Sequence, residues 1–538
     1  MPHTIASLDP RSLPPSLTTR HHLILNTPAT IDFNSPGAQG FGVKRAGLTV
    51  PGSLMLLISP ACCGRNTRAL SGPGRYGERF AYLELTTTDI VTGAHLKKIP
   101  EAARLFLESR TDRPSCLLLC TTCVDALLGT DMNRIARKTQ SLIHLPTRPC
   151  YMYALTRESL HPPMVQVRET IASLLEKPAP APVPPPCHEP PSATTNASVN
   201  LLGYFSPLSP TSDLFPLLRT LGYDATRQLS TCRTYADFQT MASSTLNLVL
   251  TPESLPAAEA MATRLHIPYI TLRRFYTPSR IHKQYQALAR ALARALGRDL
   301  DDTAWYDQAC AAIHHLKALL RPPETPCSPQ ADSEQSERFR PLGASPAFAK
   351  TSPSSGGRGL CDSERSGEHP SGAEKNNKAA LKNTTSDSPS SPRTIAREDS
   401  PLSESTQSPL PTATTNDPSR PRTIALGSRL NADPLDLALL LTSCGFTITD
   451  IITTLDASDT YFLTLLKTVS PNTRLHGALD PSMAAFRPAI LPDLTLGADA
   501  ATYYPGVPNI PWNEEIQPFG YQAPITLLKA IQTALHLS

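Results

Sequence analysis

Short apolar runs recur along the chain, and stretches with apolar residues at helical spacing separate many of them. In the N-terminal third, this pattern predicts strands at residues 53–59, 80–85, 115–123 and 141–146. The runs are largely apolar rather than alternating, which is typical of strands that helices cover on both faces. Parallel strands need crossover connections, which are usually helices, so the alternation predicts a parallel sheet of the α/β class.

The same alternation occurs in two later parts of the chain. In the middle part we predict strands at 199–205, 246–252 and 267–272, and helices at 213–223, 256–266 and 281–296. In the C-terminal part we predict strands at 422–428, 448–454, 473–479 and 492–498, and helices at 436–446, 459–469 and 523–537. The sequence therefore predicts three small open α/β units, in which ligands gather at the carboxyl ends of the strands.

Two tracts of biased composition separate these units. Residues 177–196, "KPAPAPVPPPCHEPPSATTN", form a Pro-rich linker, and residues 323–421 are dominated by Ser, Pro, Thr, Gly and mixed charge. Neither tract has enough apolar residues to offset the entropy that folding costs. We therefore predict a first domain at 1–176, a second at 197–322, a disordered insert at 323–421 and a third domain at 422–538.

Composition excludes several classes of protein. The formal net charge is only +4 over 538 residues, and nucleic-acid or membrane partners need clustered Lys and Arg, so we predict neither partner. The N-terminus lacks the apolar core of a signal peptide, and no segment approaches the roughly 18 apolar residues of a membrane span. We expect a soluble, cytoplasmic protein, whose 12 cysteines are not a disulfide framework.

Four cysteines follow predicted strands of the first domain. Cys62 and Cys63 come after its first strand, and Cys120 and Cys123 close its third. Loops at the carboxyl ends of one parallel sheet converge, so we expect these thiols to lie close together. Soft thiolates select iron-sulfur clusters or zinc, and the C-x-x-C motif of Cys120 and Cys123 also suits dithiol redox chemistry.

Two alternatives compete with an iron-sulfur site at these cysteines. A structural zinc site usually takes a second C-x-x-C motif or a closely spaced histidine pair, and the sequence has neither. Plain packing is the other interpretation, because free cysteine is among the most buried residue types. Packing is the interpretation that fits Cys116, Cys232, Cys310 and Cys444.

Five stretches, taken in order, resemble one known family. They are "ISPACCGRN" at 58–66, "YLELTTTDIVTGAHLKKIPEAARLF" at 82–106, "CTTCVDALLGTDM" at 120–132, "NLVLTPESLPAAEAMATRLHIPYI" at 247–270, and "PDLTLGADAATYY" with "QPFGYQAPITLLKAI" from 492 onward. This succession resembles the nitrogenase component 1 type oxidoreductases, which include dark-operative protochlorophyllide reductase and cofactor-assembly scaffolds. The resemblance covers nearly all of the three predicted domains, and only the insert is foreign to it.

The resemblance implies a fold, a cofactor and partners. The fold would be three Rossmann-like parallel-sheet domains, and the cofactor a 4Fe-4S cluster ligated by Cys63 and Cys123, with Cys62 and Cys120 as further ligands. The partner would be an ATP-dependent iron-sulfur reductase similar to the nitrogenase iron protein. The chain would form a homodimer, or a heterodimer with a related component 1 chain, and would pass electrons to an unidentified substrate. The alternative is a non-catalytic scaffold or sensor that binds a metallocofactor precursor or a partner protein.

The sequence also departs from the family pattern. The family has three cluster cysteines in each subunit, yet no cysteine precedes Cys62 here. The family's active-site cofactor needs a cysteine in the second domain and a histidine in the third, and residues 248–262 and 509–521 contain neither. We therefore predict that the protein is not a true dinitrogenase. The glycines at 72–77 lack the Lys-Ser/Thr ending of a phosphate loop, so ATP hydrolysis is expected of the partner.

Four arginines follow the first cysteine loop: Arg65, Arg68, Arg75 and Arg79. They are candidates to receive an acidic substrate or partner, because a guanidinium matches carboxylate geometry. A solvated surface is the alternative interpretation of this cluster.

Overall fold

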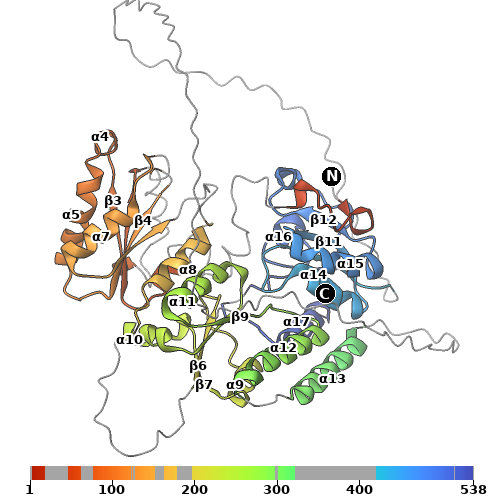
Figure 1. Ribbon diagram of the computed structural model, residues 1–538. Helices are drawn as coiled ribbons and strands as arrows, with labels where there is room; N and C mark the ends of the chain where they lie inside the picture. The colour runs from red at the N-terminus through yellow and green to blue at the C-terminus, as the bar shows by residue number, and fades with distance from the viewer. Residues whose placement is uncertain are drawn as a thin grey trace, which may run out of the picture. The chain divides into compact units, whose positions relative to one another are not determined.

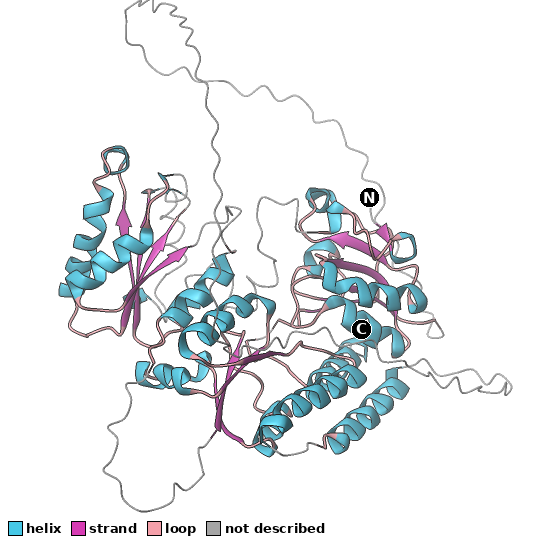
Figure 2. Ribbon diagram, in the orientation of Figure 1, coloured by secondary structure: helices cyan, strands magenta, loops and turns pink. Residues whose placement is uncertain are grey.

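The computed structural model describes residues 3–18, 46–61, 77–122, 124, 128–151, 161, 163–177, 197–296, 301–320, 420–513 and 515–536. All of them belong to one compact unit, Met1–Thr325 with Leu410–Ser538, and the second unit, Pro326–Pro409, lies outside the described residues. The described chain forms three separate sheets with helices beside them (Figure 1). Figure 2 shows the mixture of strands and helices that the sequence pattern predicts, so the α/β fold class is confirmed.

The first sheet has four parallel strands in the order β3-β2-β4-β5. Its strands are β2 (Ser53–Ser59), β3 (Phe80–Glu84), β4 (Cys116–Thr121) and β5 (Thr147–Tyr151). Its helices are α4 (Thr87–Val91), α5 (His95–Glu108), α7 (Met132–Ile143) and α8 (Pro163–Ser173). Every residue of β2 and β4 is buried, as their apolar sequences require.

The strand predicted at 141–146 is wrong. Residues 141–143 are the last residues of α7, whose buried face continues the helical spacing of Ile135, Ala136 and Thr139. His144 adopts the left-handed conformation, with φ 54°, and ends the helix. The strand begins only at Thr147.

The second sheet is also parallel, in the order β7-β6-β8-β9. Its strands are β6 (Ala197–Leu202), β7 (Tyr223–Arg227), β8 (Leu246–Val249) and β9 (Tyr269–Thr271). Its helices are α9 (Leu214–Thr220), α10 (Tyr235–Gln239), α11 (Leu255–Leu265), α12 (Pro278–Leu296) and α13 (Thr303–Leu320). The pattern did not predict β7, because this edge strand reads "YDATR" and has a single fully buried residue.

The third sheet has the order β1-β12-β11-β10-β13-β14. Its strands are β1 (His3–Thr4), β10 (Thr423–Leu426), β11 (Thr447–Thr453), β12 (Arg474–Gly477), β13 (Leu494–Leu496) and β14 (Asn509–Ile510). Its helices are α14 (Pro434–Ser443), α15 (Thr460–Val469), α16 (Ala500–Tyr503) and α17 (Gln522–His536). The N-terminal β1 pairs antiparallel with β12, with His3 opposite Leu475. This pairing differs from the sequence-based prediction, in which residues 1–176 form the first domain.

Buried polar groups join the second and third sheets. Asp436 on α14 is fully buried and accepts a hydrogen bond of 2.5 Å from the Tyr276 N–H, which lies just before α12. The Tyr276 hydroxyl donates to the Asn431 carbonyl at 2.6 Å and accepts from Trp512 Nε1 at 2.7 Å. One apolar cluster also contains residues of both sheets. These contacts fix the loops that border the cleft described below.

Some predictions fall outside the described residues. The predicted linker, apart from Lys177, and the predicted insert, apart from Arg420 and Pro421, are among them, so the domain boundaries stay predictions. Of the helices that the structure describes, none combines the length and the apolar character that crossing a bilayer requires.

Candidate functional site

The carboxyl edge of the first sheet is where the sequence predicts the cysteine site. β2 and β4 are neighbours, and their parallel register pairs Leu57 with Cys120 and Ile58 with Thr121. β2 ends at Ser59 and β4 at Thr121, so both strands end at nearly the same level. The chain segments that lead to the two cysteine loops therefore start side by side, although Cys62, Cys63 and Cys123 themselves lie outside the described residues.

Cys120 is the one predicted site cysteine that the structure describes. Its side chain is fully buried in an apolar cluster that also contains Cys116, four residues earlier on the same face of β4. Across the sheet, Cys120 is the register partner of Cys150 on β5, a buried thiol that the sequence analysis overlooked. Among the described residues, no group of three or more His, Cys, Asp or Glu side chains is arranged to hold a metal ion.

Two threonines at this edge have unsatisfied hydroxyls. Thr121 and Thr122 are 0% and 4% exposed, and among the described residues neither Oγ1 has a hydrogen-bond partner. A buried hydroxyl without a partner costs roughly 1–3 kcal/mol, so such groups call for an explanation. Thiolates and sulfides accept hydrogen bonds, and hydrogen bonds to sulfur tune iron-sulfur centres. Hydroxyl donors of this kind suit a sulfur acceptor such as that of an iron-sulfur cluster.

The segment that follows β3 forms a fixed corner at the same edge. Thr86 and Asp89 make a reciprocal capping box at the start of α4. Lys98 on α5 donates to Asp89 at 2.7 Å and to the carbonyl of Glu84, the last residue of β3. The Lys98 ammonium, together with the Thr86 donors, lowers the pKa of Asp89 to about 2. Figure 1 shows α4 beyond the carboxyl end of β3.

The Arg79 side chain hydrogen bonds to the backbone and has a structural role. Its guanidinium donates to the carbonyls of Leu48, Val50 and Ser53 at 2.7–2.9 Å, and so holds the chain at the start of β2. The other three predicted arginines, at 65, 68 and 75, lie outside the described residues. For Arg79, the interpretation as a receptor for an acidic partner is therefore not supported by its contacts.

A larger cleft lies where strands of the second and third sheets end. Its volume is about 500 Å³, and residues that follow β8, β9, β10 and β11 line it. Its charged lining residues are Glu253, Arg273, Arg274, Asp433, Asp456 and Asp459. No cysteine or histidine is present among the described residues that line it. The cleft thus offers charges and hydrogen bonds, but no soft ligand for a metal.

The second sheet supplies both arginines of this cleft together with Glu253, and the third sheet supplies the three aspartates. Arg273 donates to Ser458 Oγ at 2.8 Å, and Arg274 donates to Gln517 at 2.8 Å while its guanidinium lies 4.4 Å from the Tyr204 ring centre. The carboxylates of Asp433, Asp456 and Asp459 come from the loops after β10 and β11.

Asp459 is a carboxyl group of this cleft whose pKa is raised toward neutrality. Burial raises its pKa to about 7. The negative charges of Asp433 and Asp456 add to this, against the backbone N–H of Asp456 and the charge of Arg273. A carboxyl group with this pKa exchanges protons near neutral pH.

In the third sheet the strand order reverses at β10, between β11 and β13. A side chain already occupies the loop at this position. The Asp499 carboxylate, after β13, accepts hydrogen bonds from Ser428 N and Oγ at 2.9 and 2.7 Å and from Arg429 N at 3.0 Å. A Cβ atom at Gly427 would lie 2.2 Å from Asp499 Oδ1, so glycine is needed for this approach. The amides that bind phosphate in many such sheets are therefore engaged within the chain.

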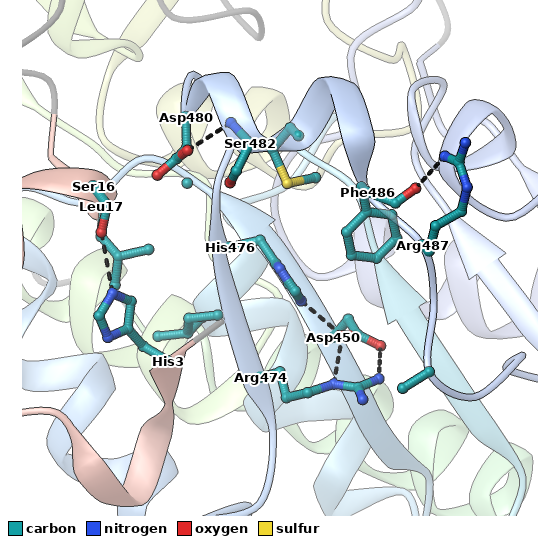
Figure 3. Close-up of a pocket in the computed structure, with 14 residues that line it drawn as sticks. His3, Ser16, Leu17, Asp450, Arg474, His476, Asp480, Ser482, Phe486 and Arg487 are labelled. Carbon is teal, nitrogen blue, oxygen red and sulfur yellow. Dashed lines mark hydrogen bonds and ion pairs between the residues drawn. The ribbon is translucent and has the colours of Figure 1, made fainter. Parts of the chain in front are cut away.

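A smaller cavity of about 240 Å³ lies beside β11 and β12 (Figure 3). Figure 3 shows Arg474 and His476 both pointing at Asp450, from the strand next to it. Arg474 binds the fully buried carboxylate through Nε and Nη2 at 2.8 and 2.7 Å, and His476 Nε2 lies 2.8 Å from Oδ1. Burial opposes ionisation, but the hydrogen bonds from His476 and Arg474 outweigh it and lower the pKa of Asp450.

This ion cluster was not predicted from the sequence. The signal was present, because Asp450, Arg474 and His476 interrupt runs predicted to be buried strands. Charged residues in such positions are paired when they are buried. The cavity is completed by His3 and Ser16 from the N-terminal segment, which hydrogen bond to each other at 3.1 Å.

Comparisons with known proteins agree with the fold and with the sequence pattern. The family model described as nitrogenase component 1 type oxidoreductase matches residues 38–315, more than half of the chain. The nitrogenase iron-molybdenum cofactor biosynthesis protein NifE of Rippkaea orientalis is 25% identical over 227 residues, which are 39% of this chain. The match spans 43% of the length of that relative.

Solved structures extend the similarity over the whole chain. A structure described as nitrogenase Cp1 at pH 6.5 aligns with a TM-score of 0.55 over 97% of this chain and 95% of the other, at 12% identity. A second, described as nitrogenase Cp1 at pH 5, aligns with a TM-score of 0.50 over 97% and 90%, at 13% identity. At this identity the likeness concerns the fold alone.

Proposed function

Because the chain belongs to the nitrogenase component 1 type oxidoreductase family, we propose that it is the iron-sulfur subunit of a nitrogenase-like complex. Proteins of this family bind iron-sulfur clusters, work with reductases similar to the nitrogenase iron protein, and form oligomers. In the proposal, an ATP-dependent iron-sulfur reductase delivers electrons to this chain in the cytoplasm. The chain passes them to a substrate that is not dinitrogen.

The proposed cofactor is a 4Fe-4S cluster at the carboxyl edge of the first sheet. Cys63 and Cys123 are its proposed main ligands, with Cys62 and Cys120 as further ones. The observation that carries this proposal is the register of β2 and β4, which starts both cysteine loops at the same level. The unsatisfied Thr121 and Thr122 hydroxyls support it as donors to sulfur. When bound, such a cluster supplies one-electron transfer.

The proposed substrate site is the 500 Å³ cleft between the strand ends of the second and third sheets. Arg273 and Arg274 supply cationic groups that bind carboxylates or other anions. Asp459 holds a proton near neutral pH, which suits a reduction that consumes protons together with electrons. Because this lining has no cysteine or histidine among the described residues, the cleft suits an organic substrate better than a metal cofactor held by soft ligands.

A scaffold or sensor is the second candidate function. The similarity to a cofactor biosynthesis protein favours it, because that relative is named for assembly rather than for substrate reduction. In this alternative the chain keeps the fold and the cluster but holds a precursor or a partner protein. The two functions differ in one respect that is measurable: only the first requires electrons to leave the chain for a bound small molecule.

One experiment tests the proposal in stages. The full chain is purified without oxygen and assayed for iron and acid-labile sulfide, and its cluster is then followed by EPR after addition of a nitrogenase iron protein with ATP. We expect iron, sulfide and an ATP-dependent change in the cluster signal. A colourless protein after reconstitution would overturn the iron-sulfur proposal. An intact cluster that no ATP-dependent reductase reduces would favour the scaffold.

A further inference from the structure

Cys120 and Cys150 lie next to each other on neighbouring strands of the first sheet. Cys120 is on β4, and Cys150 is its register partner on the parallel strand β5. Both side chains are fully buried and belong to one apolar cluster, so they lie on the same face of the sheet. The C-x-x-C motif pairs Cys120 with Cys123 in the sequence, whereas the strand register pairs it with Cys150.

The spacing of parallel strands is compatible with a disulfide bond between register partners. Neighbouring strands lie about 4.7–4.9 Å apart, and disulfides join Cα atoms that are about 4.4–6.8 Å apart. The two Cβ atoms of a disulfide are about 3.8 Å apart, which is less than the strand spacing, so the strands must approach each other slightly. This strain makes such a disulfide easier to reduce, and the bond would therefore be reversible.

Cys116 provides a comparison on the same face of the same strand. It belongs to the same apolar cluster as Cys120, but the register of β4 with β5 begins one residue later, at Leu117 with Thr147. Cys116 and Cys120 are four residues apart on one strand, a separation of roughly 13 Å that no disulfide spans. Of the three thiols in this cluster, the register therefore singles out Cys120 and Cys150.

Burial determines how this pair can react. Both thiols are 0% exposed, and a buried thiol reacts with a reagent in solution only when the chain around it opens locally. β5 is at the edge of the described first sheet, where it pairs with β4 on one side. Opening β5 breaks one ladder of backbone hydrogen bonds, whereas opening β4 breaks two. The edge strand is therefore the side from which the pair becomes accessible.

We propose that Cys120 and Cys150 form a reversible dithiol–disulfide pair. The oxidant is the disulfide of a small thiol. Each cysteine gives up one electron and one proton, a bond forms between the two sulfurs, and the S–S bond of the oxidant breaks to give two small thiols. The oxidised pair ties the edge strand β5 covalently to β4, and Cys120 is then not available to bind iron. The exchange itself needs no iron, so the pair does not depend on the proposed function.

Thiol mapping tests this pair in the full chain. The protein is incubated anaerobically with oxidised and reduced glutathione, quenched in acid, denatured and alkylated, and its linked peptides are identified by mass spectrometry. We expect a link between Cys120 and Cys150, two fewer alkylated thiols per chain than in the reduced protein, and recovery of both with dithiothreitol. Incubation in dilute urea, below the unfolding transition, makes local opening faster. Two thiols that stay alkylatable there, or a link between Cys120 and Cys123, would overturn the proposal.

Variants identify the two sulfurs, because one tryptic peptide carries Cys116, Cys120 and Cys123. Cys120→Ser and Cys150→Ser are each expected to lose the linked peptide, and the alanine variants replace them if either fails to fold. Cys116→Ser is the matched control and should keep the link. A link that persists without Cys120, or disappears without Cys116 in a folded protein, would overturn the assignment. A wild-type protein that forms the link but binds no iron would contradict the proposed function alone.

Discussion

Ile58 and Thr121 are register partners on the neighbouring parallel strands β2 and β4. β2 continues for one more residue and β4 ends at Thr121, so both strands leave the sheet at almost the same level. The next cysteines along the chain are Cys62 on one side and Cys123 on the other. A pair of cysteine loops that starts from adjacent positions is suited to share one inorganic cluster.

The first prediction concerns iron content. Cys63→Ser and Cys123→Ser are each expected to lose most of the iron and acid-labile sulfide of anaerobically purified protein, because a serine hydroxyl is a poor substitute for a thiolate in binding iron. Iron per chain and the visible absorption of the cluster are the measurements. Full iron content in both variants would show that the cluster assignment is wrong.

Cys116→Ser is the matched control for these variants. Cys116 is on β4 as well, but burial raises the pKa of its thiol to about 12, so it stays a neutral thiol rather than a thiolate ligand. We expect this variant to keep its iron and to lose some stability, since a hydroxyl is more costly than a thiol to bury in an apolar cluster. If Cys116→Ser lost as much iron as the other two, the losses would reflect unfolding instead of ligation.

The sequence alone predicted the positions of the strands that are completely buried. β2 and β4 are apolar throughout, and their positions were predicted to within a few residues. The short edge strand β7 was missed because one face of it stays partly exposed and carries polar residues. The strand predicted at 141–146 failed because an apolar run at the end of an amphipathic helix has the same local composition as a buried strand.

Long-range relationships were beyond the reach of a local pattern. Nothing in residues 3–18 indicates that they add a strand to a sheet formed more than 400 residues later, with His3 opposite Leu475. The cluster of Asp450, Arg474 and His476 likewise depends on the pairing of β11 with β12. The prediction that the two cysteine loops lie at one edge of the first sheet needs no knowledge of register, because it rests on the rule that parallel strands end at one edge.

The second prediction concerns assembly. The resemblance places two main ligands on this chain, Cys63 and Cys123, and even with Cys62 or Cys120 as an extra ligand these do not comfortably complete a four-thiolate site. We therefore expect the cluster-loaded protein to be a dimer, either of this chain or with a related component 1 chain. Sedimentation velocity under anaerobic conditions is the measurement. A monomer that carries a full complement of iron would contradict the proposed shared site.

The third prediction concerns the ion cluster in Figure 3. Asp450→Asn leaves the Arg474 guanidinium without its buried carboxylate, and removing one partner of a buried pair costs roughly 3–5 kcal/mol. Because Arg474 is partly exposed, we expect a loss of about 2–3 kcal/mol in the free energy of unfolding at pH 7. Urea unfolding of both proteins measures it. A loss below about 0.5 kcal/mol would show that the pair is not a stabilising element.

Acid titration and a surface control sharpen this test. The pKa of Asp450 is lower in the folded protein than its ordinary value of 3.8, so its contribution is present at neutral pH and disappears as the pH falls through the folded pKa. The difference between wild type and Asp450→Asn should therefore shrink below about pH 4. Glu101→Gln removes a surface ion pair with Arg104 on α5, and it should leave the unfolding midpoint at pH 7 unchanged.

The fourth prediction has the opposite dependence on pH. Burial raises the pKa of Asp459 to about 7, above its ordinary value of 3.8, so the folded protein binds a proton that the unfolded chain has already lost. Stability from this group is complete below about pH 4 and is lost as the pH rises through 7. Asp459→Asn keeps a neutral group at every pH, and its carbonyl oxygen still accepts the Asp456 N–H. This variant should therefore not lose stability in this way as the pH rises through 7.

Thermal unfolding of both proteins between pH 5 and pH 8 measures this effect. We expect the stability of Asp459→Asn relative to wild type to rise by about 1–2 kcal/mol between pH 5 and pH 8, an amount reduced from the full shift because solvent reaches the cleft. Asp224→Asn, at an exposed position on the edge strand β7, is the matched control and should not change the pH profile. If the difference in the free energy of unfolding between wild type and Asp459→Asn is the same at both pH values, Asp459 does not hold a proton near neutrality. Its proposed role as a proton carrier in the cleft would then be wrong.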